Sequence, residues 1–407
     1  MNITRRDFVV KGGMGLLALG LAGPLGLLDW DQHIASAAAQ DNILVVIQLS
    51  GGNDGLNTVV PYSTGAYYDN RPTLAIAQKD ALHLDNNLGL HPSLPNLKKL
   101  YDSGNLAIIN GVGYPNPNRS HFRSMEIWQT AAPDKLDEQT GWLGRYLDLT
   151  TNAAKNPVAA VTVGPGSKIF LAKNNDAPGV THLDTFKLIL RKAKGADRLR
   201  RQDAFFKLYD KPTEPTLILP TAKGHTAIQS SNTIQSVVKS ATAGTSYPEN
   251  SAFGDNLELI AQLVSSGLGT RTYFSMLDGF DDHSHEKDEH ARGLKELDSA
   301  LSAFYNDLVQ RNVANRVTIL VYSEFGRRVK ENASNGTDHG TAGPVFVIGP
   351  QVQGGLYGQL PSLTQLDSGD LKYQVDFRSV YSTLLDKWLK APSKDVLGGS
   401  FENLKFL

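Results

Sequence analysis

Short apolar runs alternate with amphipathic segments along the chain after residue 40. Near-continuous runs of β-branched and other apolar residues predict buried strands at Ile43–Leu49, Leu106–Asn110, Val158–Val163, Arg271–Leu277, Val317–Tyr322 and Pro344–Ile348. A 3-4-3-4 spacing of apolar residues predicts one long helix that buries Leu294, Leu297, Leu301, Phe304 and Leu308. Further helices are predicted at Phe122–Ala131, Gly141–Thr150, Asp184–Lys194 and Asn256–Ser266. The alternation of strands and helices predicts an α/β protein.

A polar stretch, Asp278–His290, directly follows one of these strands. Nine of its thirteen residues are Asp, Glu or His. A polar cluster at the C-terminal end of a strand is where open α/β sheets place ligands and metals. The alternative is a charged surface loop that caps the next helix. His285 and His290 lie five residues apart, about 140° around a helix, so they cannot bind one metal from one helix face. This spacing disfavours a metalloprotease.

Acidic or histidine residues also follow other predicted strands. Asp54 lies in the turn after the first strand, Glu324 follows Val317–Tyr322, and Asp338 and His339 share a Gly-bounded turn. Ligating side chains at several strand ends are a metal-site pattern. Asp54 has a second explanation, because Asn-Asp-Gly is a common turn sequence.

A Gly/Pro/Asn loop delivers Arg119, Ser120 and His121 to the start of a predicted helix. Ser120 is either the N-cap of that helix or an active-site serine. The second reading rests on the free N–H groups and the dipole of a helix N-terminus, which favour an anion. Arg119, His121 and Arg123 add charge complementary to phosphate or sulfate.

The N-terminus predicts export. Residues 4–11 form a twin-arginine signal, Gly12–Leu28 is its apolar region, and Ala37–Ala39 offers a cleavage site. We therefore expect a signal peptide at 1–39, use of the twin-arginine translocase, and a periplasmic or extracellular mature chain at 40–407. The alternative is an uncleaved membrane anchor.

Composition narrows the chemistry. The chain has no cysteine, so a metal would be bound by histidine and carboxylate side chains. The net charge of −1 gives no reason to expect nucleic acid as a partner. The stretch at about 195–250 is polar and predicts an insertion or surface lobe on a single domain. The chain has neither a G-x-S-x-G nucleophile elbow nor a Walker A motif.

Several motifs together resemble domain of unknown function family 1501, within the alkaline phosphatase-like superfamily. They are LVVIQLSGGNDGLNTVVPY (Leu44–Tyr62), LHPSL (Leu90–Leu94), NRSHFRSMEIWQTA (Asn118–Ala131), GWLGRYLD (Gly141–Asp148), GFDDHSH (Gly279–His285), YSEFGR (Tyr322–Arg327) and GTDHGTAGP (Gly336–Pro344). The resemblance implies an alkaline phosphatase-like, three-layer α/β/α fold around a mostly parallel central sheet.

The resemblance also implies roles for particular residues. Ser120 would be the nucleophile, with His121 and Arg119 as further catalytic residues. The residues expected to bind metal are Asp54, Asp281, His283, His285, Glu324, Asp338 and His339, with the choice between His283 and His285 open. The residues expected to bind substrate are Asn53, His91, Arg123 and Arg145. Phe325 stands where the superfamily has a histidine, which leaves one metal ion or two as alternatives.

The implied activity is metal-assisted hydrolysis of a phosphate or sulfate ester on a small molecule or glycan. One or two divalent ions, zinc or manganese, would polarise the ester and lower the pKa of Ser120 or a water. Attack by the serine would give a covalent intermediate. The alternative is a catalytically degenerate exported protein of the same fold that binds a metal or an exported protein partner.

Overall fold

The computed structural model describes residues 41–150, 156–175, 177–181, 215–242 and 244–407, with several positions between 196 and 207. The predicted signal peptide at 1–39 and the predicted helix Asp184–Lys194 lie outside the described residues. Within the described part of the chain, no helix combines the length and the apolar character needed to cross a membrane.

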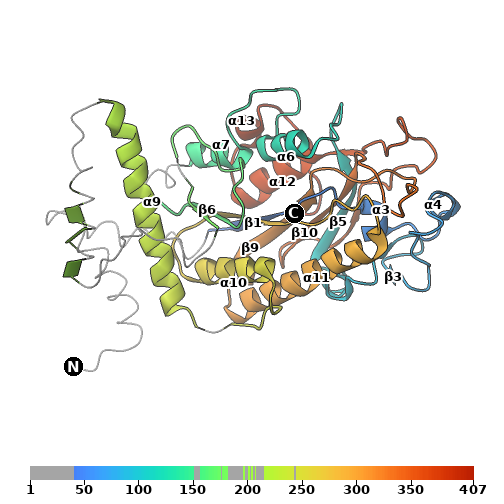
Figure 1. Ribbon diagram of the computed structural model, residues 1–407, viewed down its shortest axis with the longest axis horizontal. Helices are drawn as coiled ribbons and strands as arrows, with labels where there is room; N and C mark the ends of the chain where they lie inside the picture. The colour runs from blue at the N-terminus through green and yellow to red at the C-terminus, as the bar shows by residue number, and fades with distance from the viewer. Residues whose placement is uncertain are drawn as a thin grey trace.

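The predicted strands assemble into one mixed sheet at the centre of the protein (Figure 1). The order of strands is β11-β5-β10-β9-β1-β8-β6-β7, and β12 pairs with β5. Their bounds are β1 Ile43–Leu49, β5 Leu106–Gly113, β6 Ala160–Val163, β7 Gly179–Val180, β8 Thr272–Leu277, β9 Val317–Ser323, β10 Gly343–Ile348, β11 Gly355–Tyr357 and β12 Val375–Asp376. β1 runs parallel to β8 and β9, whereas β10 is antiparallel to β9 and β5. The sheet is therefore mostly parallel around its central strand, as predicted.

Helices cover both faces of the sheet, which confirms the predicted three-layer α/β/α architecture (Figure 1). One face carries α5 (Pro95–Asp102), α10 (Ala252–Ser265) and α11 (Glu286–Gln310). The other carries α6 (His121–Thr130), α7 (Trp142–Leu149), α12 (Phe377–Thr383) and α13 (Ser393–Leu397). Successive side chains of a strand point to opposite faces, so Val45 joins the first core and Val46 joins the second. Burial on both faces explains why β1 is apolar at nearly every position.

The other described elements lie at the margins. They are α3 Gly55–Thr58, β2 Val59–Val60, α4 Gly65–Asn70, β3 Leu82–His83, β4 Gly89–Leu90, α9 Pro215–Ser240, the 3-10 turn η2 Ala314–Arg316 and the π-helical turn η3 Leu384–Leu389. β2, β4 and β3 form a small second sheet. The stretch predicted as a polar insertion contains α9, which buries Ile228 and Ile234.

Candidate metal centre

The C-terminal ends of β1, β8 and β9 reach the same edge of the sheet because these strands are parallel. After β8 the chain crosses the turn that follows β1, and Phe280 N donates a hydrogen bond to Ser50 O (3.1 Å). Gly51 has a φ of +116°, and a Cβ there would lie 2.4 Å from Asp281 N. Glycine permits both this backbone conformation and this close approach. The crossing places Asp281 over the end of the central strand.

Four side chains converge at this edge. Asp281 Oδ1 lies 3.1 Å from Nε2 of both His283 and His339, and these two nitrogens are 2.9 Å apart. His121, in the first turn of α6, places Nε2 3.5 Å from Asp281 Oδ2. Ligand atoms of His121, Asp281 and His339 all lie within 4.8 Å of one another. The four side chains are between 22 % and 50 % exposed, so a molecule from solvent can reach this centre.

Hydrogen bonds select the histidine tautomers. His339 Nδ1 lies 2.8 Å from the Arg119 carbonyl oxygen. A carbonyl only accepts, so Nδ1 carries the hydrogen and Nε2 of the neutral ring presents a lone pair. Burial lowers the pKa of His339, which favours this neutral form. His121 Nδ1 lies 2.9 Å from Glu324 Oε1, and this hydrogen bond raises the pKa of His121.

The cluster fits a divalent metal ion. A tetrahedral site with bonds of about 2.0–2.2 Å has its ligand atoms about 3.3–3.6 Å apart. The four contacts given above span 2.9 to 3.5 Å, close to that spacing. The group whose ligand atoms all lie within 4.8 Å of one another is His121, Asp281 and His339, and His283 adjoins it through Asp281 and His339. At these distances the ring nitrogens and the carboxylate have to share protons or a cation, and a divalent ion placed among them would be bound by their lone pairs. Mixed imidazole and carboxylate donors suit zinc and also manganese.

A buried guanidinium supports Asp281 from the protein side. Arg327 Nη2 donates to Asp281 Oδ1 (2.8 Å), and its other hydrogen bonds go to backbone carbonyls, those of Gly51, Gly52, Phe280 and Thr337. Burial alone would raise the pKa of Asp281, but the hydrogen bonds from Arg327 and His339 and the nearby positive charge together outweigh it and lower the pKa to about 2. Asp281 is therefore ionised at neutral pH and available to a cation.

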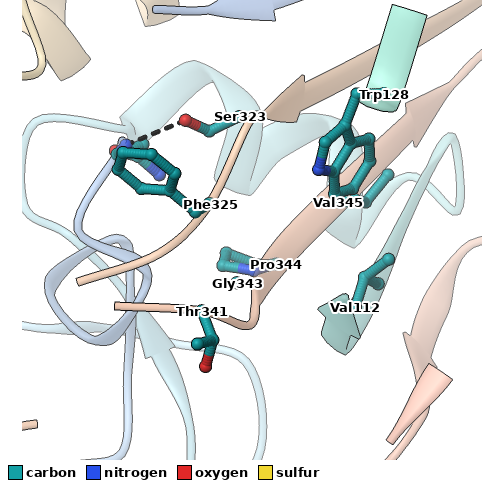
Figure 2. A pocket seen from close by; sticks show the side chains of 9 residues that line it. Val112, Trp128, Ser323, Phe325, Thr341, Gly343, Pro344 and Val345 are labelled. Atoms are coloured by element: carbon teal, nitrogen blue, oxygen red, sulfur yellow. Dashed lines mark hydrogen bonds between the residues drawn. The ribbon is translucent and has the colours of Figure 1, made fainter. Parts of the chain in front are cut away.

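Phe325 forms an apolar wall of the centre. Its ring centroid lies 4.9 Å from that of His121 and 4.8 Å from that of His339. Phe325 also lines a small internal cavity with Asn53, Val112, Trp128, Ser323, Thr341, Gly343, Pro344 and Val345 (Figure 2). The cavity volume of about 10 Å³ leaves room for about one water. A cavity of this size is too small for a substrate.

Glu324 lies behind His121. It is completely buried, and its Oε1 accepts hydrogen bonds from His121 Nδ1 and from Gly51 N, both at 2.9 Å. Ser323 Oγ lies 3.2 Å from Oε2. The structure thus brings Glu324, predicted as a ligand, to the rear of an imidazole rather than into the group of converging ligand atoms.

Ser120 and Arg119 lie at the rim, directly before His121 in the chain. Ser120 is the exposed N-cap of α6, and its side chain makes no capping hydrogen bond. Arg119 Nη2 pairs with Asp370 Oδ2 at 2.8 Å, while the Arg119 carbonyl holds His339. The hydroxyl of Ser120 is therefore not committed to its own helix.

Asp54 lies in a separate, buried cluster. Both of its carboxylate oxygens accept from the guanidinium of Arg71, and it caps α3 through Leu56 N (3.3 Å). Burial would raise the pKa of Asp54, but Arg71 outweighs it and holds that pKa well below its usual range. Burial and then the charge of Asp54 raise the pKa of the adjacent Glu286 to about 9, so Glu286 is neutral at pH 7. The Arg71 cation already balances the charge of this cluster.

Asn53 and His91 face the same interior cluster. Asn53 Oδ1 lies 2.9 Å from His290 Nε2, and the His91 ring meets the His290 ring edge-on at 5.7 Å. Burial lowers the pKa of His91 to about 4 and that of His290 to about 3. His290, the last residue of the polar stretch Asp278–His290, is buried instead of lying on a charged surface. A signal existed: His290 lies four residues before Leu294, on the apolar face of α11.

The remaining predicted residues lie around or away from the centre. Arg123 donates to Glu126 and to two carbonyls of the following loop, and Arg145 donates to the carbonyls of Thr130, Thr140 and Val396. Asp338 Oδ1 lies 3.5 Å from His283 Nδ1, beside the cluster. His285 is exposed at the N-cap of α11, and in the described part of the chain no interaction links its side chain to the cluster. Of the two histidines left open by the sequence, the structure brings His283 to Asp281.

The fold and the cluster define a class: an α/β protein with a histidine–carboxylate group at the C-terminal edge of its sheet. The chain belongs to the family described as "Protein of unknown function (DUF1501)", which matches residues 107–390. This match confirms the family predicted from the sequence motifs. No curated protein matches the chain.

Among solved structures, the chain is similar to the PsFucS1 sulfatase from Pseudoalteromonas sp., with 11 % identity over 100 % of this chain and 75 % of that one, at a TM-score of 0.42. It is also similar to the C-terminal periplasmic domain of EcEptC from Escherichia coli in complex with Zn, with 9 % identity, 77 % and 74 % coverage and a TM-score of 0.38. A protein in the alkaline phosphatase superfamily from Vibrio parahaemolyticus gives 10 % identity, 87 % and 71 % coverage and a TM-score of 0.34. At such scores, function has to be argued from the chain's own residues.

Proposed function

We propose that this protein is a metal-dependent hydrolase of phosphate or sulfate esters, with its centre at His121, Asp281, His283 and His339. The observation that carries the proposal is the close approach of His283 Nε2, His339 Nε2 and Asp281 Oδ1, at 2.9 to 3.1 Å from one another. A divalent ion held there would polarise an ester oxygen. Zinc or manganese fits the donor set.

Ser120 is the proposed nucleophile. Its hydroxyl is exposed, makes no capping bond, and precedes His121 at the N-terminus of the ten-residue helix α6. Free N–H groups of the first helical turn favour the anionic group of the substrate. Attack by Ser120 Oγ on phosphorus or sulfur forms a serine ester, and the serine proton leaves with the released alcohol. Water then cleaves the serine ester, restoring the hydroxyl and releasing phosphate or sulfate.

Arg119 supplies positive charge at the rim. Its side chain is 41 % exposed and pairs with the buried carboxylate of Asp370. A guanidinium held in this way is preorganised to meet a second anion through its free N–H groups. The open side of the cluster suits a small-molecule ester or the ester group of a glycan.

A specific observation favours a second candidate, a metal-binding protein without turnover. Both carboxylate oxygens of Asp54 accept hydrogen bonds from Arg71, and Glu324 accepts one from His121. Neither carboxylate therefore joins a second group of metal ligands. In the residues that the structure describes, one group with metal-ligand geometry is found. A single ion without a second one to hold the leaving oxygen is compatible with binding alone.

The two candidates separate in one experiment. The mature protein, 40–407, is stripped with a chelator, loaded with Zn²⁺ or Mn²⁺, and assayed with aryl phosphates and aryl sulfates. We expect metal-dependent turnover that Ser120→Ala and His339→Ala abolish, while Ser299→Ala, a control serine on α11, leaves it unchanged. Turnover that survives Ser120→Ala would exclude the serine as nucleophile. Stoichiometric metal with no turnover on either ester class would select the binding protein.

We also propose that residues 1–39 direct export through the twin-arginine pathway to the periplasm or beyond. The support is the Arg5–Arg6 pair before an apolar segment. Arg5→Lys/Arg6→Lys should retain the full-length chain in the cytoplasm, measured by fractionation and by the mass of the N-terminal peptide. Unchanged export of the double variant would contradict this.

A further inference from the structure

Glu324 is a completely buried carboxylate in direct contact with His121. Its Oε1 accepts two hydrogen bonds at 2.9 Å, one from Gly51 N and one from His121 Nδ1. Two donors use both lone pairs of that oxygen, and Ser323 Oγ lies against Oε2 at 3.2 Å. The oxygen of Glu324 that faces His121 is therefore fully used, and Glu324 is not part of the group of converging ligand atoms.

The same contacts orient His121. A carboxylate accepts, so the Nδ1 of His121 carries a hydrogen, and Nε2 is the nitrogen left to bind a metal ion. That Nε2 is buried, and within the described residues it has no hydrogen-bond partner. It lies 3.5 Å from Asp281 Oδ2, inside the group of converging ligand atoms. An orphaned, buried nitrogen lone pair next to a carboxylate is a group that a cation would satisfy.

The buried negative charge of Glu324 also favours a cation near His121. Among the described side chains, the only basic group within 4.0 Å of the Glu324 carboxylate is His121. A buried carboxylate is costly unless a positive charge compensates it. The compensating charge therefore acts through the His121 ring, whose Nε2 faces the group of converging ligand atoms. A carboxylate behind an imidazole also makes the imidazole a stronger electron donor to a metal.

We propose that Glu324 is a positioning residue that fixes His121 as a metal ligand through a Glu324–His121–metal arrangement; this role rests on the metal site proposed above. Gly51 couples the arrangement to the fold. The N–H of Gly51 donates to Glu324, which supports His121. Because Gly51 has no side chain, the backbone of Asp281 can lie directly against it, so this glycine helps to position both residues.

The test measures metal affinity instead of turnover. Chelator-stripped protein is titrated with Zn²⁺ against a chromophoric chelator, and with Co²⁺ by visible absorption. Glu324→Ala removes the acceptor behind His121 and should weaken Zn²⁺ binding about 10–100-fold. Glu324→Gln keeps an oxygen that accepts from both N–H groups, so it should restore most of the affinity. The Co²⁺ band of Glu324→Ala should change in the same direction as that of His121→Ala.

The matched control is Asp298→Ala. Asp298 is also a buried carboxylate, and it accepts from the backbone N–H groups of Asn96 and Leu97 at the start of α5. Its loss should lower stability but leave Zn²⁺ affinity unchanged. Because Glu324→Gln preserves both hydrogen bonds, it tests the proposal even if Glu324→Ala folds poorly.

Two results would overturn the positioning role. If Glu324→Gln loses as much affinity as His339→Ala, Glu324 binds the ion directly. If Glu324→Ala binds Zn²⁺ with the affinity of the wild type, the Glu324 carboxylate has a structural role only. Wild-type protein that binds no Zn²⁺ or Co²⁺ would remove both this role and the proposed metal site. If the wild type and the variants show the expected Zn²⁺ affinities but no ester hydrolysis, the hydrolase proposal is contradicted and the positioning role of Glu324 stands.

Discussion

Arg71→Met is the sharpest test of the buried cluster beneath the metal centre. The Arg71 guanidinium is fully buried, pairs with both oxygens of Asp54, and donates to the carbonyls of Val329 (3.0 Å) and Arg328 (2.9 Å). Methionine fills similar space but leaves the Asp54 carboxylate without its ion-pair partner. Breaking a buried pair in this way costs about 3–5 kcal/mol. Against a total stability of about 5–15 kcal/mol, that is a large share.

The cost should depend on pH in a defined direction. In the wild type the pKa of Asp54 is depressed, so its contribution to stability is present above the unfolded value of about 3.9 and is lost below it. In Arg71→Met the guanidinium no longer offsets the burial of Asp54, which is the largest influence on its pKa and raises it, so the penalty grows as pH rises above about 3.9. The stability gap between the two proteins should therefore be wide at pH 7 and narrow towards pH 4.

Urea unfolding followed by circular dichroism and by fluorescence measures the gap, provided the two probes coincide. The double variant Asp54→Asn/Arg71→Met removes both charges, so it should lose less than the sum of the single variants, with a coupling of up to about 3 kcal/mol. Arg145→Met is the control, because that guanidinium binds carbonyls and lies 4.0 Å from its nearest carboxylate, Glu138. A gap that stays the same between pH 7 and pH 4, or no coupling in the double variant, would refute the reasoning.

Three further predictions follow from the centre and the cluster beside it. Glu286→Gln should gain stability over the wild type as pH rises from about 4.3 towards 9, because the raised pKa of Glu286 costs the wild type stability in that window; parallel urea midpoints from pH 5 to pH 8 would contradict this. Zn²⁺ at 100 times its Kd should raise the free energy of unfolding by about 2.7 kcal/mol, and Asp281→Asn should remove most of the shift; an equal shift in both proteins would place the ion elsewhere. Gly51→Ala should weaken Zn²⁺ binding, because its Cβ would lie 2.4 Å from Asp281 N, while Gly166→Ala, with nothing within 4 Å of the added carbon, should not; equal affinity in the two variants would count against the Gly51–Asp281 contact.

Local patterns were sufficient for the longer strands of the sheet, whereas the short strands β7, β11 and β12 were not predicted. β1 occupies the predicted residues 43–49, and β8 and β9 each differ from prediction by one residue. A strand with helices on both faces has to be apolar on both sides, so a short run of consecutive apolar residues is enough to predict it. The spacing of apolar residues also predicted the buried face of α11. One helical turn before Leu294 this face includes His290, which is buried as well.

The ligand set depended on contacts that no local pattern contains. Asp54 stands at a strand end like a ligand, yet Arg71, seventeen residues later, takes both of its oxygens. His121 was expected beside the chemistry as a catalytic residue, and only the position of α6 shows its Nε2 entering the group with Asp281 and His339. Residue type tells which side chains are able to bind a metal. It does not tell which of them already has a partner.

The family, the layers and the edge of the sheet where ligating residues gather follow from the sequence, because burial and periodicity are properties of neighbouring residues. The folded chain is needed to see that His283, not His285, meets Asp281, and that Glu324 lies behind an imidazole. These outcomes depend on distances of 2.9 to 3.5 Å between segments as much as about 200 residues apart, such as His121 and Glu324. Hydrogen bonds and ion pairs act over such short distances that only the folded chain fixes which groups meet.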